Sequence, residues 1–256
     1  MFDSGIGGLT VLAALREVLP QAPVIYAADN AGLPYGDKTE AQIAARVAGL
    51  LGRMTERLHP RLVCIACNTA STIALGMVRD VLEVPVVGTV PAIKPAAAYS
   101  RSGSIGLLGT AATIRQAYVD RLEHEFAGGK RLLRHGAPEL VAAAEGKLRG
   151  EPIDPGAFRR AVDGLRCQPG GAAIDTVVLA CTHFPLLSEE LRAAFGPGVR
   201  LVDGALGIAR RIAHLTQGQS FARDRPDGAL FTRNHADLAA LSPALARYGL
   251  NRLDIF

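Results

Sequence analysis

Two cysteines lie far apart in the chain but in closely similar sequence contexts. Residues 63–69 read VCIACNT and residues 177–183 read VVLACTH. In each copy an apolar run with β-branched residues ends in Ala-Cys, and polar residues follow. Such a run is typical of a buried strand, so each cysteine is predicted at the point where a strand gives way to a loop. Ligands bind at this end of the strands in open α/β sheets. The repeated feature therefore favours a fold in which two strand ends, each with a thiol, face one ligand.

The rest of the chain alternates between short apolar runs and amphipathic segments. Strands are predicted at residues 24–28, 62–66, 84–88, 104–108, 131–134, 176–180 and 199–202. Helices are predicted at residues 9–18, 40–58, 71–81, 113–126, 138–149, 155–167, 187–195 and 204–216. Residues 217–228 are polar with Gly and Pro and predict a loop, before a last strand near 231–232 and a helix over 236–248. Helices between strands indicate parallel sheets built from βαβ units.

A second internal similarity suggests that the chain contains two related halves. Residues 3–8 (DSGIGG) and 106–113 (GLLGTAAT) both precede a predicted helix, and each lies a similar distance before one of the paired cysteines. We therefore expect an α/β fold with two pseudo-symmetric lobes, each a mainly parallel sheet flanked by helices, with the active site in the cleft between them. The first lobe is predicted to comprise residues 1–92 plus 204–256, and the second residues 93–203.

Composition excludes several classes of protein. The chain has 256 residues, of which 49% are hydrophobic and 20% charged, which is enough for a real core and unlike a disordered chain. The net charge is +4, but the basic residues are scattered, so nucleic acid is not an expected partner. No segment resembles a signal peptide or a membrane span, so we expect a cytoplasmic protein without a membrane partner. Four cysteines do not indicate a disulfide scaffold.

Cys67 and Cys181 are the first candidate catalytic residues. A single cysteine is more often a small buried hydrophobic residue, but both of these are followed by hydrogen-bonding residues where a core would stay apolar. Two thiols on opposite sides of a substrate can remove a proton from one face of a carbon and return one to the other. His183 lies two residues after Cys181, and its near-neutral pKa makes it a plausible proton partner.

The glycine-rich segment at residues 3–8 is predicted to be a turn before a helix. It lacks the G-x-G-x-x-G spacing and a Walker lysine, so a turn whose N–H groups cradle a carboxylate fits better than a nucleotide loop. Asp3 is then placed to take or hold a proton, although a helix cap with turn glycines would explain the segment equally well.

Redox and cofactor chemistry are less favoured. Cys64 and Cys67 form a C-x-x-C, which leaves a redox pair open, but side chains three apart on a strand point to opposite faces, and we interpret Cys64 as core packing. We expect no metal, since a second C-x-x-C and paired histidines are missing from the sequence. No lysine lies in an obvious Schiff-base setting, so pyridoxal phosphate is not expected.

Four motifs, in the same order, resemble those of the cofactor-independent aspartate/glutamate racemases, and within them the bacterial glutamate racemases. They are residues 3–8 (DSGIGG), 34–36 (PYG), 66–71 (ACNTAS) and 180–187 (ACTHFPLL). The resemblance runs from residue 3 to about residue 216, and more weakly beyond. It implies that one thiolate removes the α-proton of glutamate while the opposite thiol protonates the other face, supplying D-glutamate for peptidoglycan synthesis. No cofactor is implied, and family members are often homodimers.

The resemblance also implies roles for individual residues. Cys67 would act on D-glutamate with help from Asp3, and Cys181 would act on L-glutamate with help from His183. Glu145 also contributes, because residues 136–145 (GAPELVAAAE) are similar to a family segment that carries a glutamate. The carboxylates and ammonium of the substrate would contact Ser4, Pro34, Tyr35, Gly36, Asn68, Thr69, Thr110, Thr113 and Thr182.

Three positions depart from the family pattern. Only two residues precede Asp3, where the family has a strand, so we expect a loss of stability and of Asp3 positioning that an N-terminal extension would restore. Glu139 is more polar than usual, and Ala137 replaces a third cysteine of many relatives, which should be harmless. Two other functions stay open: a racemase of aspartate or another small carboxylate, and a two-lobed amino-acid-binding protein without catalysis.

Overall fold

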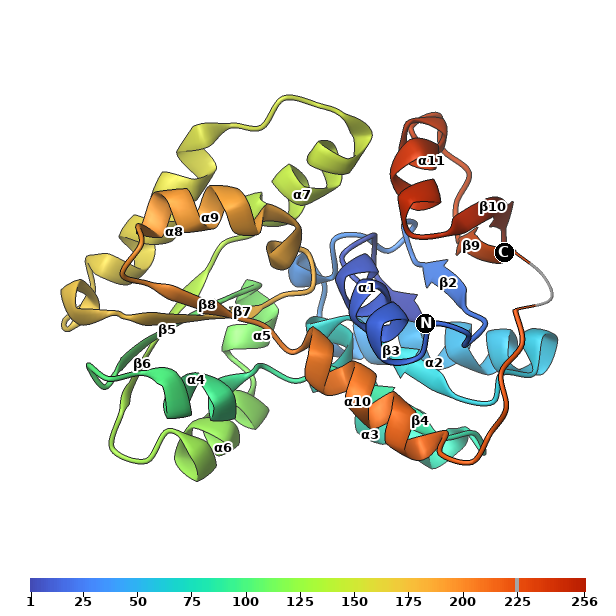
Figure 1. Ribbon diagram of the computed structural model, residues 1–256, viewed down its shortest axis with the longest axis horizontal. Coiled ribbons are helices and arrows are strands. Elements are labelled where there is room, and N and C mark those ends of the chain that lie inside the picture. Colours follow the sequence, from blue (N-terminus) through green and yellow to red (C-terminus); the bar gives the residue numbers. More distant parts are fainter. Residues whose placement is uncertain (224–225) are drawn as a thin grey trace.

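The computed structural model describes residues 1–223 and 226–256, and these form two α/β lobes (Figure 1). The strands are β1 (Phe2–Asp3), β2 (Ile25–Ala28), β3 (Val63–Ile65), β4 (Val86–Gly88), β5 (Ser104–Gly109), β6 (Arg131–Gly136), β7 (Thr176–Ala180), β8 (Arg200–Val202), β9 (Asp227–Phe231) and β10 (Leu250–Ile255). The helices are α1 (Leu9–Val18), α2 (Glu40–Leu58), α3 (Asn68–Val81), α4 (Ile93–Tyr99), α5 (Ala111–Ile114), α6 (Ala117–Phe126), α7 (Glu139–Arg149), α8 (Pro155–Arg166), α9 (Ser188–Phe195), α10 (Ala205–Leu215) and α11 (Leu238–Arg247). Three short 3-10 helices are η1 (Tyr35–Asp37), η2 (Gly171–Ala173) and η3 (Phe184–Leu187).

Each lobe is built on one parallel sheet. The larger sheet has the strand order β10-β9-β2-β1-β3-β4 and the smaller one β6-β5-β7-β8. Every pairing in both sheets is parallel. The prediction of two lobes, each a parallel sheet flanked by helices, is confirmed. Parallel strands end at the same sheet edge, so Cys67 after β3 and Asp3 at the end of β1 come together in one lobe, and Cys181 after β7 in the other.

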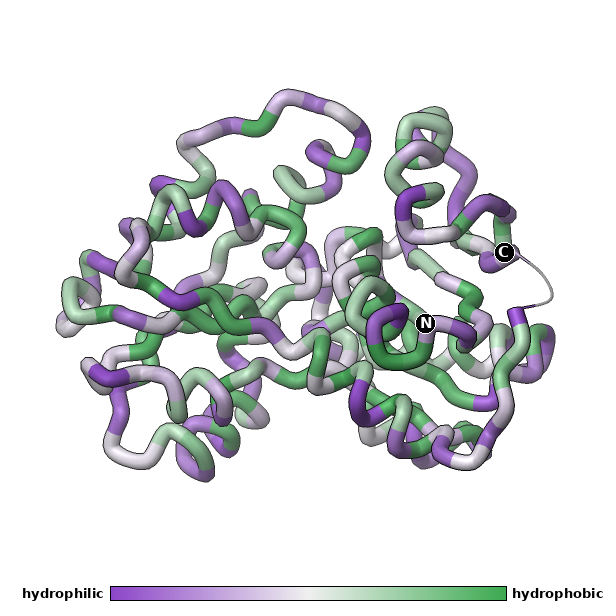
Figure 2. Tube along the Cα trace, in the orientation of Figure 1, coloured by the Kyte–Doolittle hydropathy of each residue, from purple (hydrophilic) through white to green (hydrophobic). Residues whose placement is uncertain are grey.

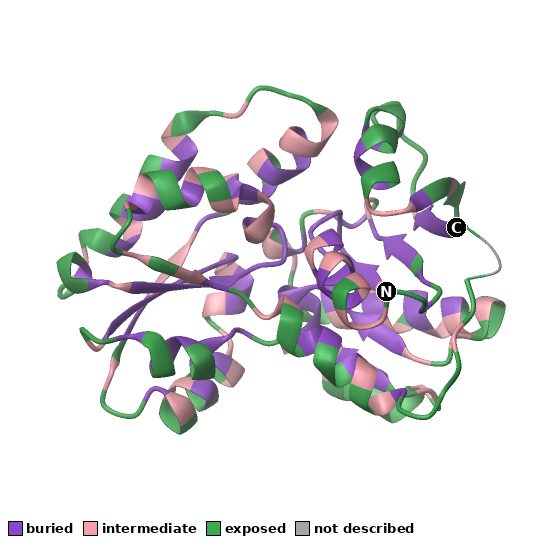
Figure 3. Ribbon diagram, in the orientation of Figure 1, coloured by how far each residue is buried: buried purple, intermediate pink, exposed green. Residues whose placement is uncertain are grey.

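Helices cover both faces of each sheet, as parallel strands require. One face of the larger sheet packs on α1, α10 and α11, and the other on α2 and α3. The smaller sheet lies between α7, α8 and α9 on one face and α4 and α6 on the other. Most of the strands are hydrophobic and buried, with the edge strand β10 as an exception, whereas the outward faces of the helices are hydrophilic and exposed (Figures 2 and 3). None of the helices in the described part of the chain is long and apolar enough to span a membrane.

The strand that leads into the glycine-rich turn has only two residues but occupies the middle of its sheet. Phe2 pairs with Ala27 on one side and Ile65 on the other, and Asp3 pairs with Ala28. The backbone N–H groups of the neighbouring strands donate to the carbonyls of Met1, Phe2 and Asp3 at 2.7–2.8 Å. A short strand was expected, and these bonds are what hold Asp3 at the sheet edge.

Several element boundaries differ from the prediction. The helix predicted over 113–126 is two helices, because Gln116 is extended (φ −71°, ψ 133°) and separates α5 from α6. Helix α3 begins at Asn68 rather than at residue 71, which makes Cys67 its N-cap residue. Neither α4 nor β10 was predicted, and the polar residues of β10 hide its strand pattern at the sheet edge. Within the predicted loop at 217–228, residues 224–225 lie outside the described residues and β9 already begins at Asp227.

Candidate active site

A cavity of about 290 Å³ lies between the two lobes and is lined by both of the paired cysteines. Its size suits a small ligand, since pockets for small molecules begin at roughly 300 Å³. Of the site residues predicted from the sequence, those that line it are Ser4, Pro34, Tyr35, Gly36, Cys67, Asn68, Thr69, Thr110, Cys181, Thr182 and His183. The other three, Asp3, Thr113 and Glu145, are buried directly behind this lining and bond to it.

Cys67 lies beside Ser4 and the buried carboxyl group of Asp3. The Sγ atom of Cys67 is 3.6 Å from the Ser4 hydroxyl. Asp3 accepts hydrogen bonds from the backbone N–H groups of Ser4 (2.7 Å) and Gly8 (2.5 Å). Burial raises the pKa of Asp3 despite the opposing charge of His183, and burial together with the nearby Asp3 raises the pKa of the Cys67 thiol. At neutral pH Cys67 therefore holds its proton next to a carboxyl group.

Cys181 lies beside an imidazole that is itself anchored by a carboxylate. The Sγ atom of Cys181 is 3.8 Å from Nδ1 of His183, and Nε2 of His183 is 2.8 Å from Oε1 of Glu145. Burial alone lowers the pKa of His183, but its hydrogen bonds to Cys181 and Glu145 outweigh that effect and the pKa lies well above its usual value. The imidazole is therefore protonated, and its positive charge faces the sulfur of Cys181.

The glycine-rich turn brings the two lobes into contact at Glu145. The backbone N–H of Ile6 donates to Oε1 of Glu145 at 3.0 Å, the same oxygen that binds His183. A Cβ atom at Gly5 would overlap this oxygen, and one at Gly7 would lie 2.6 Å from the backbone N of His183. The turn does cradle carboxylates, as expected, and the carboxylates that it binds are those of Asp3 and Glu145.

Three threonines form a hydroxyl cluster beside the cavity. The Oγ1 atoms of Thr69, Thr110 and Thr113 lie 3.0–3.1 Å from one another, which links α3 of the first lobe to α5 of the second. Next to them Asn68 is buried, and within the described residues its Oδ1 has no hydrogen-bond partner. A buried acceptor without a partner favours a donor on the ligand, such as an ammonium group.

Tyr35 lines the cavity, but its hydroxyl is engaged by a residue that the sequence analysis missed. The hydroxyl donates to Oδ2 of Asp29 at 2.7 Å, and Asp29 is also bound by Arg46 and Thr232. One signal could have identified Asp29, because it directly follows the predicted strand at 24–28, at the same sheet edge as Asp3 and Cys67.

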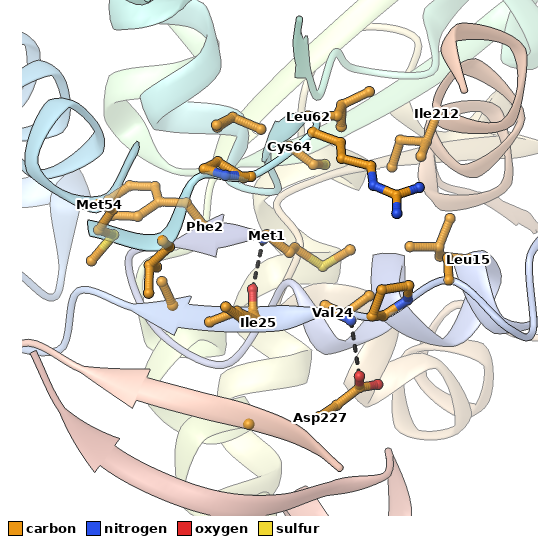
Figure 4. Close-up of a pocket in the computed structure, with 18 of the residues that line it drawn as sticks. Met1, Phe2, Leu15, Val24, Ile25, Met54, Leu62, Cys64, Ile212 and Asp227 are labelled. Carbon is orange, nitrogen blue, oxygen red and sulfur yellow. Dashed lines mark hydrogen bonds between the residues drawn. The ribbon is translucent and has the colours of Figure 1, made fainter. Parts of the chain in front are cut away.

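A second, larger cavity of about 550 Å³ lies at the opposite ends of the strands β1, β2 and β3. It is mainly apolar, and Figure 4 shows Met1, Phe2, Val24, Ile25 and Cys64 around it. Cys64 thus faces a different cavity from Cys67, and burial raises its pKa to about 12, as fits core packing. Ligands of α/β sheets bind at the carboxyl ends of the strands, so we assign the chemistry to the smaller cavity.

The described residues were also searched for metal-binding groups. Within residues 1–223 and 226–256, no cluster of three or more His, Cys, Asp or Glu side chains is arranged to hold a metal ion.

Two thiols across an inter-lobe cavity are the arrangement that the sequence resemblance implied, and comparison with known proteins defines the class. The Asp/Glu/Hydantoin racemase family model matches residues 10–212, and the chain belongs to this family. It is therefore an isomerase. The resemblance noted from the motifs is confirmed.

Within this family, the chain is similar to individual glutamate racemases. The chain is 61% identical over 254 residues to the glutamate racemase of Sphingopyxis alaskensis, covering 99% of this chain and 95% of that protein. It is 42% identical over 262 residues to the glutamate racemase of Escherichia coli strain K12, covering 99% and 89%. A crystal structure of E. coli glutamate racemase with L-glutamate and the activator UDP-MurNAc-ala superposes with a TM-score of 0.92 at 40% identity, covering 100% of this chain and 96% of that one. The Thermus thermophilus enzyme with β-chloro-D-alanine gives 0.75 at 30% identity, covering 100% and 94%.

Proposed function

We propose that the chain is a glutamate racemase that interconverts L- and D-glutamate with two thiols and no cofactor. The observation that carries the proposal is the single 290 Å³ cavity lined by Cys67 from one lobe and Cys181 from the other. The glutamate racemases to which the chain is similar over nearly its whole length support the choice of substrate. The E. coli enzyme, which is similar in structure, was crystallised with L-glutamate.

The two thiols take opposite roles in each direction of the reaction. Cys181, paired with protonated His183, is the thiolate that removes the α-proton of L-glutamate, so a C–H bond breaks and an S–H bond forms. The electron pair left on the α-carbon then takes the proton of the Cys67 thiol from the opposite face, which gives D-glutamate and a Cys67 thiolate. The reverse reaction begins from that thiolate, with Asp3 as the neighbouring proton acceptor and donor.

The remaining polar residues bind the substrate and stabilise the negative charge that develops. Because the α-proton of an amino acid is weakly acidic, the charge has to be met by donors that are already oriented in a dry cavity. Cys67 is the N-cap residue of α3, and the backbone N–H groups at a helix start favour an anion there. The substrate-contacting set is Ser4, Pro34, Tyr35, Gly36, Asn68, Thr69, Thr110, Thr113 and Thr182, with Asn68 Oδ1 free to accept from the ammonium group.

The wider assignments rest on the same inference. Residues 1–92 plus 204–256 form the first lobe and residues 93–203 the second, in line with the composition of the two sheets. The enzyme acts in the cytoplasm as a homodimer, and its D-glutamate enters peptidoglycan synthesis and so supports cell wall biogenesis and cell shape.

Proton NMR in D₂O tests the proposed function directly. Purified protein without added cofactor is incubated with L-glutamate in one tube and L-aspartate in another. Loss of the α-proton signal from glutamate alone, with D-glutamate formed, is the expected result. Exchange only with aspartate would identify a racemase of the shorter substrate, and no exchange with either from folded, reduced protein would refute the activity.

A further inference from the structure

Asp29 is a buried carboxylate that the two-thiol reaction does not use. It follows β2 at the sheet edge that carries the active site, and its backbone N–H donates to the carbonyl of Asp3 at 2.8 Å. The side chain is fully buried, and burying a charge is costly unless hydrogen bonds and an opposite charge compensate. Because burying the charge of Asp29 costs stability, we looked for a function of this carboxylate in the neighbouring active site.

Three side chains from separate parts of the first lobe satisfy this carboxylate. Arg46 of α2 forms an ion pair with it, with Nη2 at 2.6 Å from Oδ1. Thr232, just after β9, donates its hydroxyl to Oδ1 at 2.6 Å. Tyr35 donates its hydroxyl to Oδ2 at 2.7 Å. Burial raises the pKa of Asp29, but the hydrogen bonds from these three groups outweigh it and leave the pKa below its usual value, so the group is charged.

Tyr35 connects this network to the catalytic cavity. Tyr35 belongs to the cavity wall formed by residues 33–37, while its hydroxyl is held by Asp29. Burial and the charge of Asp29 raise the pKa of Tyr35, so the hydroxyl keeps its proton and remains the donor. The loop is packed tightly onto the network, because a Cβ atom at Gly32 would lie 2.6 Å from Nε of Arg46 and 2.8 Å from the Tyr35 ring.

We propose that Asp29 is a positioning residue that fixes the wall of the catalytic cavity by holding the Tyr35 hydroxyl, and that Arg46 and Thr232 hold Asp29 in place. The Tyr35 hydroxyl then serves the loop, and only the ring and the loop backbone face the substrate. This inference rests on the proposed function, since it takes glutamate as the occupant of the cavity. It also gives the C-terminal segment, through Thr232, a part in shaping the active site.

A wall residue that contacts the substrate equally in the ground state and the transition state affects KM more than kcat. We therefore expect Asp29→Asn and Tyr35→Phe each to raise KM by about tenfold for both glutamate enantiomers, the loss that follows from one charge-assisted hydrogen bond, with kcat changed less than threefold. Because the two residues act through one bond, the double variant should match the single variants rather than show a hundredfold rise.

The kinetic constants of these variants, measured for both enantiomers, decide whether the Tyr35 hydroxyl binds Asp29 or the substrate. A rise in KM for Tyr35→Phe without one for Asp29→Asn would place the hydroxyl on the substrate and overturn the proposal. Multiplying effects in the double variant would overturn it as well. An inactive parent would refute the proposed function, whereas an active parent with unchanged KM in both variants would refute the positioning role alone.

Matched controls separate positioning from general damage. Arg46→Gln should raise KM in the same way, whereas Arg53→Gln, at an exposed position two turns further along α2, should leave both constants unchanged. Thr232→Val keeps the charge pair and should raise KM about threefold, so it tests the network even where Asp29→Asn fails to fold. Unchanged KM in both Thr232→Val and Tyr35→Phe would overturn the proposal.

Discussion

Cys67 and Cys181 end equivalent strands in the two lobes, yet their surroundings are electrostatically opposite. Cys67 has a buried carboxyl group beside it, and both groups have raised pKa values. Cys181 has the protonated imidazole of His183 at 3.8 Å, anchored by Glu145. The backbone is pseudo-symmetric, but the charges are not. The comparison teaches that two thiols at equivalent strand ends can have different neighbours: Cys67 lies beside a buried acid, and Cys181 lies beside a cation.

The largest effect is expected from removing either thiol. Cys67→Ser and Cys181→Ser should each lower kcat by about 10³-fold, because an alcohol is too weak an acid to supply a base near neutral pH. Circular dichroism of glutamate solutions measures the rate. Cys167→Ser alters an exposed cysteine away from the cavity and should keep the parent rate. Retention of a tenth of the activity in either active-site variant would show that one thiol suffices, and it would contradict separate roles for the two thiols.

The two assisting groups should affect the two directions differently. His183→Asn is expected to lower kcat by about 10²-fold from L-glutamate and less from D-glutamate, and Asp3→Asn the reverse. The enantiomers have equal free energy, so kcat/KM must stay equal in the two directions, and the asymmetry appears in kcat and KM separately. Progress curves from each enantiomer measure these constants. Equal losses of kcat in both directions for both variants would contradict the assignment of one assisting group to each thiol.

The contact between the lobes at Glu145 can be disturbed without touching a titratable group. A methyl group at Gly5 would overlap Oε1 of Glu145, so Gly5→Ala should displace this carboxylate from His183 and lower kcat about tenfold. Gly49→Ala is the matched control, since a Cβ there meets no atom within 4 Å and alanine favours the α2 helix. If Gly5→Ala and Gly49→Ala turned over glutamate equally fast, the contact would have no catalytic importance.

The hydrogen-bonded pair of His183 and Glu145 predicts how the stability of the protein depends on pH. His183 has a raised pKa in the folded protein, so protonated His183 contributes stability that is fully present below its unfolded pKa of about 6.5 and is lost as pH rises through the folded value. Glu145→Gln removes the anchoring carboxylate. The difference in unfolding free energy between parent and variant should therefore be largest near pH 6 and shrink at alkaline pH. Urea titrations at several pH values measure it, and a difference that grows with pH would contradict the charge assigned to His183.

The smallest effect is expected from filling the cavity of about 550 Å³ at the opposite ends of β1, β2 and β3. Phe2 and Cys64 line this cavity, and Phe2 leads directly into Asp3. Filling the cavity should therefore stabilise the strand that carries Asp3, with no direct effect on the lobe of Cys181. Two or three β-branched residues added before Met1 would extend β1 between β2 and β3, and each kcal/mol gained should raise Tm by about 2–4 °C. A Gly-Ser extension of equal length is the control. Equal Tm values for both extensions would show that the added strand does not enter the cavity.

Local sequence patterns were enough to predict most of the architecture. The apolar runs located both paired cysteines at strand ends, and the four motifs that carry the family resemblance contain ten of the cavity-lining residues. These features can be predicted because strand and helix periodicity and turn preferences depend on residues that are close together in the sequence. The break between α5 and α6 was missed because Gln116 carries no breaker signal, and β10 was missed because an edge strand tolerates polar residues.

The sequence by itself therefore determined the parallel sheets, the two thiols and the polar residues that follow them. Only the tertiary structure decided how the groups beside the thiols and the cavity are held by distant parts of the chain. Ile6 reaches Glu145 across 139 residues, and Thr232 reaches Asp29 across 203. Such contacts depend on how the lobes and the C-terminal strands pack, which no local pattern encodes. The hydrogen bonds formed in that packing then keep Asp29 and His183 charged against the opposing effect of burial, because these partners come together only once the chain has folded.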